Sequence, residues 1–196
     1  FQKVIKVPYT QDSALKRRKI FRPIYHLLIL IDSLIQLFMK TLAVIGFGAN
    51  LGSTVAQIQA ARQAITKLPK TIETAFSPLY KTAPHEASGP DYINAVQLIE
   101  TGLSAQALLR YLQAIEFAQG RQRSFRHAPR TLDLDLLLFG SETLSSSYLT
   151  LPHPRMHERA FVLVPLLNVW PEAFIPGQGF AQDLLAQLPP QPVERL

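Results

Sequence analysis

Two aspartates and four arginines stand close together in one stretch of the 196-residue chain. The arginines come first, within residues 121–130, and no acidic residue lies among them. Asp133 and Asp135 follow in a run of leucines that ends at Phe139. Paired carboxylates bind hard cations such as Mg²⁺, and guanidinium groups match phosphate oxygens, each charged hydrogen bond contributing about 1.5–3 kcal/mol. This combination is typical of phosphoryl transfer from a nucleotide.

The two aspartates need an element that presents them together. Residues 133–139, followed by Gly140, have the length and flanks of a buried strand. On a strand, Asp133 and Asp135 project to one face and the intervening leucines to the other, with the two aspartate Cα atoms about 6.5–7 Å apart. Burying two carboxylates is costly, so the arginines either form structural salt bridges to them or bind an outside anion. The arginines outnumber the two aspartates, which favours the anion.

The run from His127 to Leu138, HAPRTLDLDLLL, resembles the signature of the 6-hydroxymethyl-7,8-dihydropterin pyrophosphokinase family of folate-pathway enzymes. The resemblance covers about residues 41–176 and recurs in several motifs. It implies transfer of diphosphate from ATP, the co-substrate, to 6-hydroxymethyl-7,8-dihydropterin, with release of AMP. It also implies that Asp133 and Asp135 bind two Mg²⁺ ions, and that Arg121 and Arg130 act with them as catalytic residues.

A second familiar segment, HPRMHER, begins at His153 and ends at Arg159, and its two histidines and two arginines form a predicted cationic cluster. The resemblance implies an ATP site formed by Gln113, Glu116, Arg123, Thr150, His153 and Arg159. It implies a pterin site formed by Thr82, Ala83, Pro84, His85, Tyr92, Asn94 and Phe161. An amide such as that of Asn94 offers a donor and an acceptor to a pterin edge, and aromatic rings stack on a flat bicycle. Without the resemblance, Asn94 is interpreted as a core amide, and Gln113 and Glu116, three residues apart, as neighbours on a solvated helix surface.

Hydrophobic periodicity predicts the elements that carry these residues. Strands are expected over residues 41–47, 71–80, 92–99 and 133–139, and helices over about 54–69, 105–120 and 157–169. Gly48, Asn50 and Gly52 are assigned to the turn after the first strand. The order βαββαβ with additional C-terminal elements predicts an α+β, ferredoxin-like sandwich, which the resemblance also implies.

The net charge of +6 and the pI near 9.7 suggest a nucleic-acid-binding protein. The charge is concentrated, however, because residues 1–40 hold eight basic and two acidic residues, whereas residues 41–196 hold twelve of each. A ferredoxin-like nucleic-acid module also predicts aromatic-rich central strands, where this chain has aspartates. A third alternative is a pterin-binding scaffold without catalysis. We therefore expect small-molecule substrates, no nucleic-acid partner and a monomer.

The chain contains no cysteine, which excludes disulfides and thiolate metal sites and fits a cytoplasmic protein. A basic cluster at residues 16–19 precedes an apolar stretch, 24–38, that is shorter than the roughly 20 residues of a membrane-spanning helix. We interpret residues 1–38 as an N-terminal extension outside the native domain, and residues 39–196 as the pyrophosphokinase domain, with no membrane association. The alternative is a surface helix that binds a membrane or a partner.

Overall fold

A computed structural model of the chain describes residues 40–84, 89–120 and 131–196. The predictions made for residues 1–38, for His85 and for the arginines Arg121, Arg123 and Arg130 lie outside these ranges. The described part belongs to one compact unit, Lys40–Leu196. No described helix has the length and hydropathy that a membrane span requires.

One antiparallel sheet of six strands organises the described residues. Its strands are β1 (Thr41–Ala49), β2 (Thr71–Phe76), β3 (Tyr80–Thr82), β4 (Tyr92–Thr101), β5 (Asp133–Phe139) and β10 (Glu194–Arg195). Their order is β10-β3-β4-β1-β5, and β2 also pairs with β4. Two short hairpins stand apart, β6 (Leu144–Ser145) with β7 (Thr150–Leu151) and β8 (Phe174–Ile175) with β9 (Gly179–Phe180).

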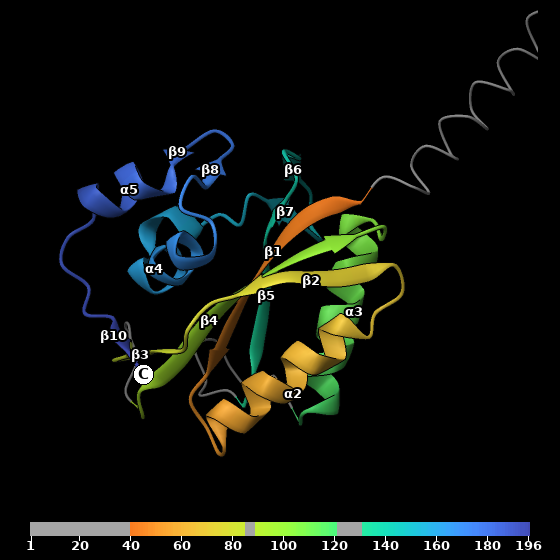
Figure 1. Cartoon of the computed structure of the whole chain (residues 1–196), viewed down its shortest axis with the longest axis horizontal. Coiled ribbons are helices and arrows are strands. Elements are labelled where there is room, and N and C mark those ends of the chain that lie inside the picture. Colours follow the sequence, from red (N-terminus) through yellow and green to blue (C-terminus); the bar gives the residue numbers. More distant parts are fainter. Residues whose placement is uncertain (1–39, 85–88, 121–130) are drawn as a thin grey trace, which may run out of the picture. The chain divides into compact units, whose positions relative to one another are not determined.

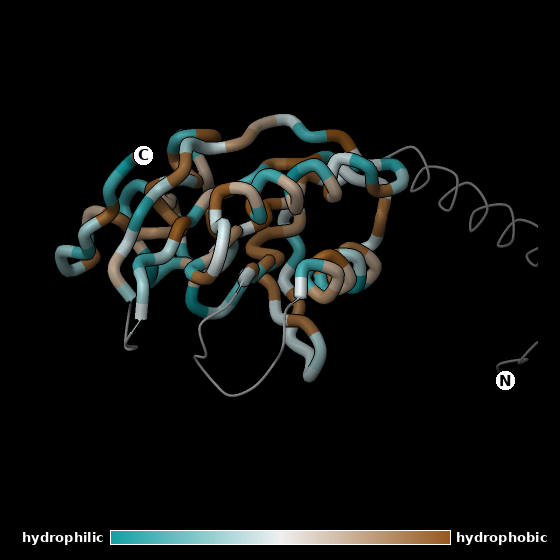
Figure 2. Tube along the Cα trace, turned by 90° about the horizontal axis from the view of Figure 1, so that it is seen from below, coloured by the Kyte–Doolittle hydropathy of each residue, from teal (hydrophilic) through white to brown (hydrophobic). Residues whose placement is uncertain are grey.

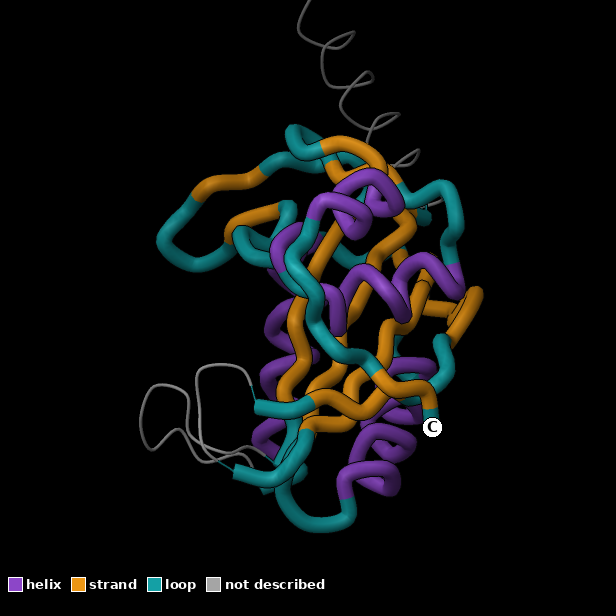
Figure 3. The backbone as a smooth tube through the Cα atoms, turned by 90° about the vertical axis from the view of Figure 1, so that its left-hand side faces the viewer, coloured by secondary structure: helices purple, strands orange, loops and turns teal. Residues whose placement is uncertain are grey.

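Helices cover both faces of this sheet (Figure 1, Figure 3). Helices α2 (Thr54–Thr66) and α3 (Ala105–Ala118) lie on one face. The 3₁₀ turn η1 (Met156–Glu158), α4 (Ala160–Val169) and α5 (Ala181–Gln187) lie on the other. The strand order and the antiparallel pairing confirm the predicted βαββαβ sandwich with additional C-terminal elements.

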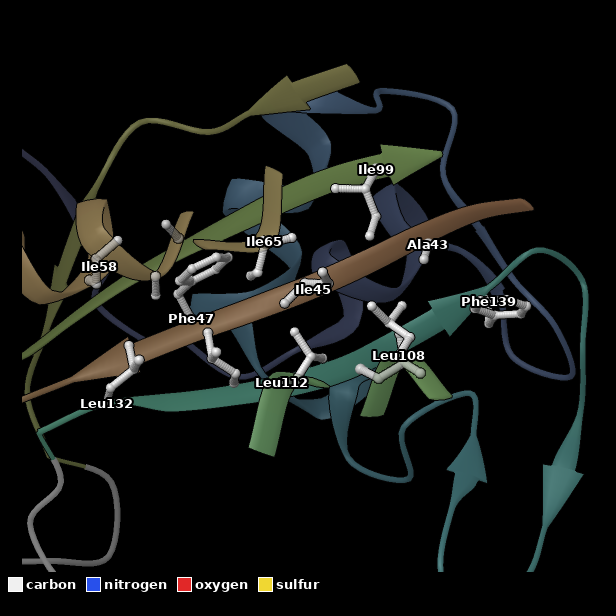
Figure 4. Packing of buried hydrophobic residues seen from close by; sticks show 14 of the residues in the cluster. Ala43, Ile45, Phe47, Ile58, Ile65, Ile99, Leu108, Leu112, Leu132 and Phe139 are labelled. Atoms are coloured by element: carbon white, nitrogen blue, oxygen red, sulfur yellow. The ribbon is translucent and has the colours of Figure 1, made fainter. Parts of the chain in front are cut away.

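Each face of the sheet packs a hydrophobic core of its own, because side chains alternate along a strand. On β1, Ile45 and Phe47 belong to the hydrophobic cluster that also holds Ile58 and Ile65 of α2 and Leu108 of α3 (Figure 4). Val44 points to the opposite face and packs with Met156 and Leu163. Both hydrophobic (brown) and hydrophilic (teal) stretches occur along the chain trace (Figure 2).

The strand predicted over residues 71–80 is two strands, and this part of the prediction was wrong. β2 ends at Phe76 and β3 begins at Tyr80. Pro78 lies between them, and proline has no N–H for a sheet ladder. Ser77 maintains the link to β4 instead, since its N–H donates to the Val96 carbonyl at 2.9 Å and its Oγ accepts from the Val96 N–H at 2.9 Å.

The helix predicted over residues 157–169 begins later, at Ala160. Arg159 has an extended backbone with φ −121° and ψ 108°, and it separates η1 from α4. Its carbonyl accepts hydrogen bonds from the N–H groups of Val162 and Leu163 and so starts the helix. Pro165 lies inside α4 and does not end it, because the helix is held by buried neighbours such as Leu163 and Leu166.

The turn role assigned to Gly48 was wrong, because β1 continues to Ala49. Gly48 is paired with Asn94 of β4 on one side and with Asp133 of β5 on the other. Gly46 is paired in the same way with Val96 and Asp135. Both glycines therefore lie in the centre of the sheet, on the face that α4 covers.

Candidate active site

A pocket lies between the α4 side and the three adjacent strands β4, β1 and β5. Asp133 and Asp135 both line it, whereas Leu134 and Leu136 belong to the opposite core. This confirms the strand and the shared face predicted for the two aspartates. The predicted site residues that line the pocket are Thr82, Ala83, Tyr92, Asn94, Asp133, Asp135, Arg159 and Phe161.

On the β4 side of the pocket, a hydrogen bond holds the side-chain amide of Asn94 in one orientation. Asn94 is only 4% exposed, and its Nδ2 donates to Thr82 Oγ1 at 2.8 Å. Its Oδ1 is the atom nearest to the open position above Gly48. Because Thr82 holds the nitrogen, the carbonyl oxygen of Asn94 is turned toward the middle of the pocket. Tyr92, two residues earlier on the same strand face, lies beside this amide.

Two guanidinium groups face the carboxylates from the η1–α4 segment. Arg155 and Arg159 both line the pocket, and the Arg159 guanidinium lies 5.5 Å from the centre of the Phe161 ring. Burial, followed by repulsion from Arg155, lowers the pKa of Arg159, while the charges of Asp135 and Asp133 act in the opposite direction. Arginine nevertheless stays protonated at neutral pH, so the pocket presents two positive groups opposite two negative ones.

His153 is close to this pocket but does not line it. Burial, together with the charges of Arg159 and Arg155, lowers the pKa of His153 to about 4, while the charge of Asp133 opposes the change. Its backbone N–H donates to the Leu137 carbonyl of β5 at 2.9 Å, which fixes the segment to the strand. At neutral pH the imidazole is therefore neutral. The predicted cluster of cations consequently includes Arg155 and Arg159 but not His153.

Four other predicted site residues that the structure describes do not line the pocket: Pro84, Gln113, Glu116 and Thr150. Without the resemblance, Gln113 and Glu116 were interpreted as neighbours on a solvated helix surface, and for Glu116 that interpretation was wrong. Glu116 is 2% exposed, and its Oε1 accepts the N–H of Leu134 at 2.7 Å. α3 packs against the end strand β5, so this part of the helix faces the strand and not solvent. Gln113 Oε1 accepts from the Tyr148 hydroxyl at 3.4 Å.

Several pocket residues were missed from the sequence, namely Gly46, Gly48, Leu137 and Val162, whereas Arg155 was predicted only as a member of the cationic cluster. A signal existed for the glycines, because two residues spaced i and i+2 on a strand share a face. The same spacing applies to Leu137, which lies two residues after Asp135 and shares its face. The pairing of β1 with β5 shifts between Val44 and Ile45, and this shift places the next residue, Leu138, in the same core as Val44.

The donor set fits magnesium. No group of three or more His, Cys, Asp or Glu side chains among the described residues is arranged to hold a metal ion. Asp133 and Asp135 are therefore the carboxylates that the described pocket offers. Mg²⁺ is commonly bound through one or two carboxylates, together with water and the phosphates of a substrate, without a complete protein cage.

Comparisons with known proteins identify the family of the chain. Residues 44–171 match the model of the 7,8-dihydro-6-hydroxymethylpterin-pyrophosphokinase family. A 2-amino-4-hydroxy-6-hydroxymethyldihydropteridine pyrophosphokinase of Pseudomonas aeruginosa is 44% identical over 153 residues, which is 78% of this chain and 94% of that protein. The enzyme of that name from Haemophilus influenzae is 44% identical over 146 residues, 74% of this chain and 91% of that protein.

Solved structures show the same fold. A crystal structure described as HPPK-DHPS in complex with substrates superposes with a TM-score of 0.60 at 14% identity, and covers 76% of this chain and 43% of that one. Wild-type HPPK-DHPS of Plasmodium falciparum gives a TM-score of 0.57 at 15% identity, with 76% and 41% covered. The chain thus spans less than half of those proteins. From the family match, the two 44% identical relatives and the shared fold, the chain belongs to the 7,8-dihydro-6-hydroxymethylpterin-pyrophosphokinase family.

Proposed function

We propose that this protein transfers diphosphate from ATP to 6-hydroxymethyl-7,8-dihydropterin in folate biosynthesis, giving AMP and the pterin diphosphate. Membership of the family supports the reaction. The single observation that carries it is the pocket in which Asp133 and Asp135 lie beside a fixed amide and opposite two guanidinium groups. A metal–phosphate complex and a planar acceptor are the ligands that such a set of groups recognises.

The strand order supports a spatial division of this pocket. The acceptor ring lies on the β4 side, where Asn94 offers hydrogen bonds and Tyr92 and Phe161 offer aromatic faces. The nucleotide lies toward the outer edge of β5, where Gln113 and Thr150 contact it and the buried Glu116 holds the strand through the Leu134 N–H. The aspartates of β5 stand between the two, next to the phosphates that are transferred. His85, Thr82, Ala83 and Pro84 complete the pterin side.

Asp133 and Asp135 hold two Mg²⁺ ions in this proposal, with phosphate oxygens and water as the remaining ligands. When bound, the ions neutralise phosphate charge and favour deprotonation of the attacking hydroxyl. The two aspartates act by orienting the bound complex. They are held at neighbouring positions of one strand face, so their spacing is fixed by the strand.

Charged arginines and the neutral His153 both contact the phosphates in this proposal. The attack falls on the β-phosphorus, so charge develops between the α- and β-phosphates, where Arg121 and Arg130 neutralise it. Arg123, Arg159 and His153 hold phosphate oxygens. Because burial keeps the pKa of His153 near 4, this imidazole contributes a neutral N–H donor at physiological pH.

We further propose that the protein acts as a cytoplasmic monomer without a nucleic-acid partner. The absence of cysteine is typical of a reducing compartment. The equal numbers of basic and acidic residues in 41–196 give no excess positive charge for a nucleic-acid backbone.

The test is AMP formation from ATP, Mg²⁺ and 6-hydroxymethyl-7,8-dihydropterin by the purified chain and by Asp135→Asn. The substitution keeps the shape of the side chain but removes its charge, and we expect at least about a hundredfold loss of turnover. Asp183→Asn, at an exposed position of α5, serves as the matched control and should retain wild-type turnover. Pterin binding without AMP formation by the wild type would instead indicate a binding scaffold, and full turnover by Asp135→Asn would refute the metal assignment.

A further inference from the structure

The C-terminal tail, residues 188–196, contacts the segment that carries Arg159. The match to the family model ends before this tail begins. The tail follows α5 and ends as β10, which pairs with β3 (Figure 1). At its start, Leu188 packs against the hydrophobic core on the α4 side of the sheet. At its end, the Leu196 N–H donates to the Leu79 carbonyl at 3.0 Å. Both ends of the tail are therefore attached to the folded core.

One side chain of this tail, Gln191, binds the backbone on both sides of Arg159. Its Oε1 accepts the Ala160 N–H at 2.9 Å, and its Nε2 donates to the Glu158 carbonyl at 3.0 Å. The Ala160 N–H lies in the first turn of α4, where no intrahelical acceptor exists, and the side chain of Arg159 does not cap the helix. A single amide can satisfy both backbone groups because it offers a donor and an acceptor side by side.

The residues around Gln191 restrict the backbone that presents it. Pro189 and Pro190 precede it, and Pro192 follows it. Proline fixes its own φ near −65° and disfavours the helical conformation of the residue before it. Leu188 accordingly has φ −69° and ψ 145°. Because the prolines restrict the unfolded chain as well, holding Gln191 in place costs less conformational freedom on folding.

Arg159 needs support because its charge is unfavourable where it lies. Burial, followed by repulsion from Arg155, lowers the pKa of Arg159, and the attraction of Asp135 and Asp133 does not outweigh these effects. A long side chain on an unrestrained backbone would instead carry its charged end into water. The hydrogen bonds from Gln191 restrain the peptide groups on both sides of Arg159, so they fix the direction in which its side chain leaves the backbone.

We propose that Gln191 is a positioning residue: by pairing with the peptide groups that flank Arg159, it holds the Arg159 guanidinium in the pocket to bind the nucleotide phosphates. The inference rests on the proposed function for the ligand, Mg²⁺-ATP, and for the contact between Arg159 and phosphate. Gln191 does not line the pocket and acts only through Arg159. An arginine that is already held in place loses less freedom when the phosphates bind.

Gln191→Met tests this proposal on the full chain, because methionine has a similar length but lacks the amide donor and acceptor. The probe is Mg²⁺ with α,β-methylene-ATP, in which the bond that breaks in the proposed reaction is replaced. Its dissociation constant, measured by calorimetry, should rise about fivefold, which corresponds to ordering one long side chain on binding. The melting temperature should fall by about 2–4 °C, because α4 loses a cap.

The same substitution in an Arg159→Ala background distinguishes positioning from a general loss of structure. If Gln191 acts through Arg159, adding Gln191→Met to Arg159→Ala should change the dissociation constant by less than about twofold. Where binding is too weak for calorimetry, the rate of AMP formation at subsaturating ATP gives the same comparison. An equal loss in both backgrounds would overturn the inference, and so would wild-type nucleotide affinity in Gln191→Met.

Gln187→Met is the matched control, because Gln187 is exposed at the end of α5, just before the tail. Its nucleotide affinity and melting temperature should equal those of the wild type, and a fivefold loss of affinity in this variant would also overturn the inference. If the wild type forms AMP and Gln191→Met binds the nucleotide normally, only the role of Gln191 is wrong. If the wild type neither forms AMP nor binds the nucleotide, the proposed function fails and the role of Gln191 fails with it.

Discussion

Glu116 supplies a hydrogen-bond acceptor at the end strand of the sheet. In the described part of the chain, β5 stands last in the strand order, so its outer edge has no neighbouring strand. The Leu134 N–H, between the two aspartates, is accepted by Glu116 Oε1 at 2.7 Å, and both residues are almost fully buried. The Glu116 carboxylate thus accepts the hydrogen bond from the Leu134 N–H that a backbone carbonyl of a neighbouring strand would otherwise accept. Substituting Glu116 should therefore affect both stability and the positions of Asp133 and Asp135.

The magnitude follows from the cost of a buried N–H without an acceptor. Glu116→Ala removes the carboxylate, and an unsatisfied buried donor costs about 1–3 kcal/mol. For a protein of this size, each kcal/mol lowers the melting temperature by about 2–4 °C, so a decrease of roughly 2–12 °C is expected. Glu116→Gln keeps a neutral oxygen acceptor and should lose about half as much, since hydrogen bonds to neutral groups are weaker than those to charged groups.

Urea unfolding at pH 7, followed by circular dichroism, measures both variants. Glu142→Ala, at an exposed position, is the control and should change the unfolding free energy by less than about 0.5 kcal/mol. Glu116→Ala should also turn over more slowly than Glu142→Ala, because β5 loses a contact between its two aspartates. If Glu116→Ala is as stable as the control, or if Glu116→Gln is as unstable as Glu116→Ala, the reasoning about the Leu134 N–H is refuted.

Two further predictions concern pH. Hydrogen bonds from Arg62, at 2.8 and 2.6 Å, and then from Gln97, at 2.6 Å, lower the pKa of Glu73. The stability from this pair is therefore present at pH 7 and is lost as the pH falls through the lowered pKa. Arg62→Met should cost about 1–2 kcal/mol at pH 7, and urea unfolding at pH 3 should show a smaller difference; an equal difference at both pH values would contradict the pairing. For His153, burial lowers the folded pKa to about 4 from the ordinary 6.5. The unfolded chain therefore takes up a proton first, and stability falls as the pH drops from 6.5 to 4. An NMR titration should show one histidine with a pKa near 4, and a value near 6.5 for His153 would exclude its burial.

The sequence alone determined what local periodicity controls. The alternation of leucine with Asp133 and Asp135 fixed a strand with both carboxylates on one face, and the structure has that strand at the predicted residues. The helix expected from residue 105 begins there, and the side chain of the preceding Ser104 accepts the Ala107 N–H at the start of α3. These features depend on neighbours within a few residues, so no distant contact was needed to infer them.

Only the tertiary structure decided which distant residues meet. Gly48 lies between Asn94 and Asp133 because three strands, far apart in the sequence, pair in one register. Register depends on the packing of the whole sheet, and the sequence around Gly48 was equally compatible with a turn. Glu116 is buried, and His153 is neutral, because of segments that fold over them and exclude water. Burial and register arise from contacts between distant segments, and periodicity within one segment does not contain that information.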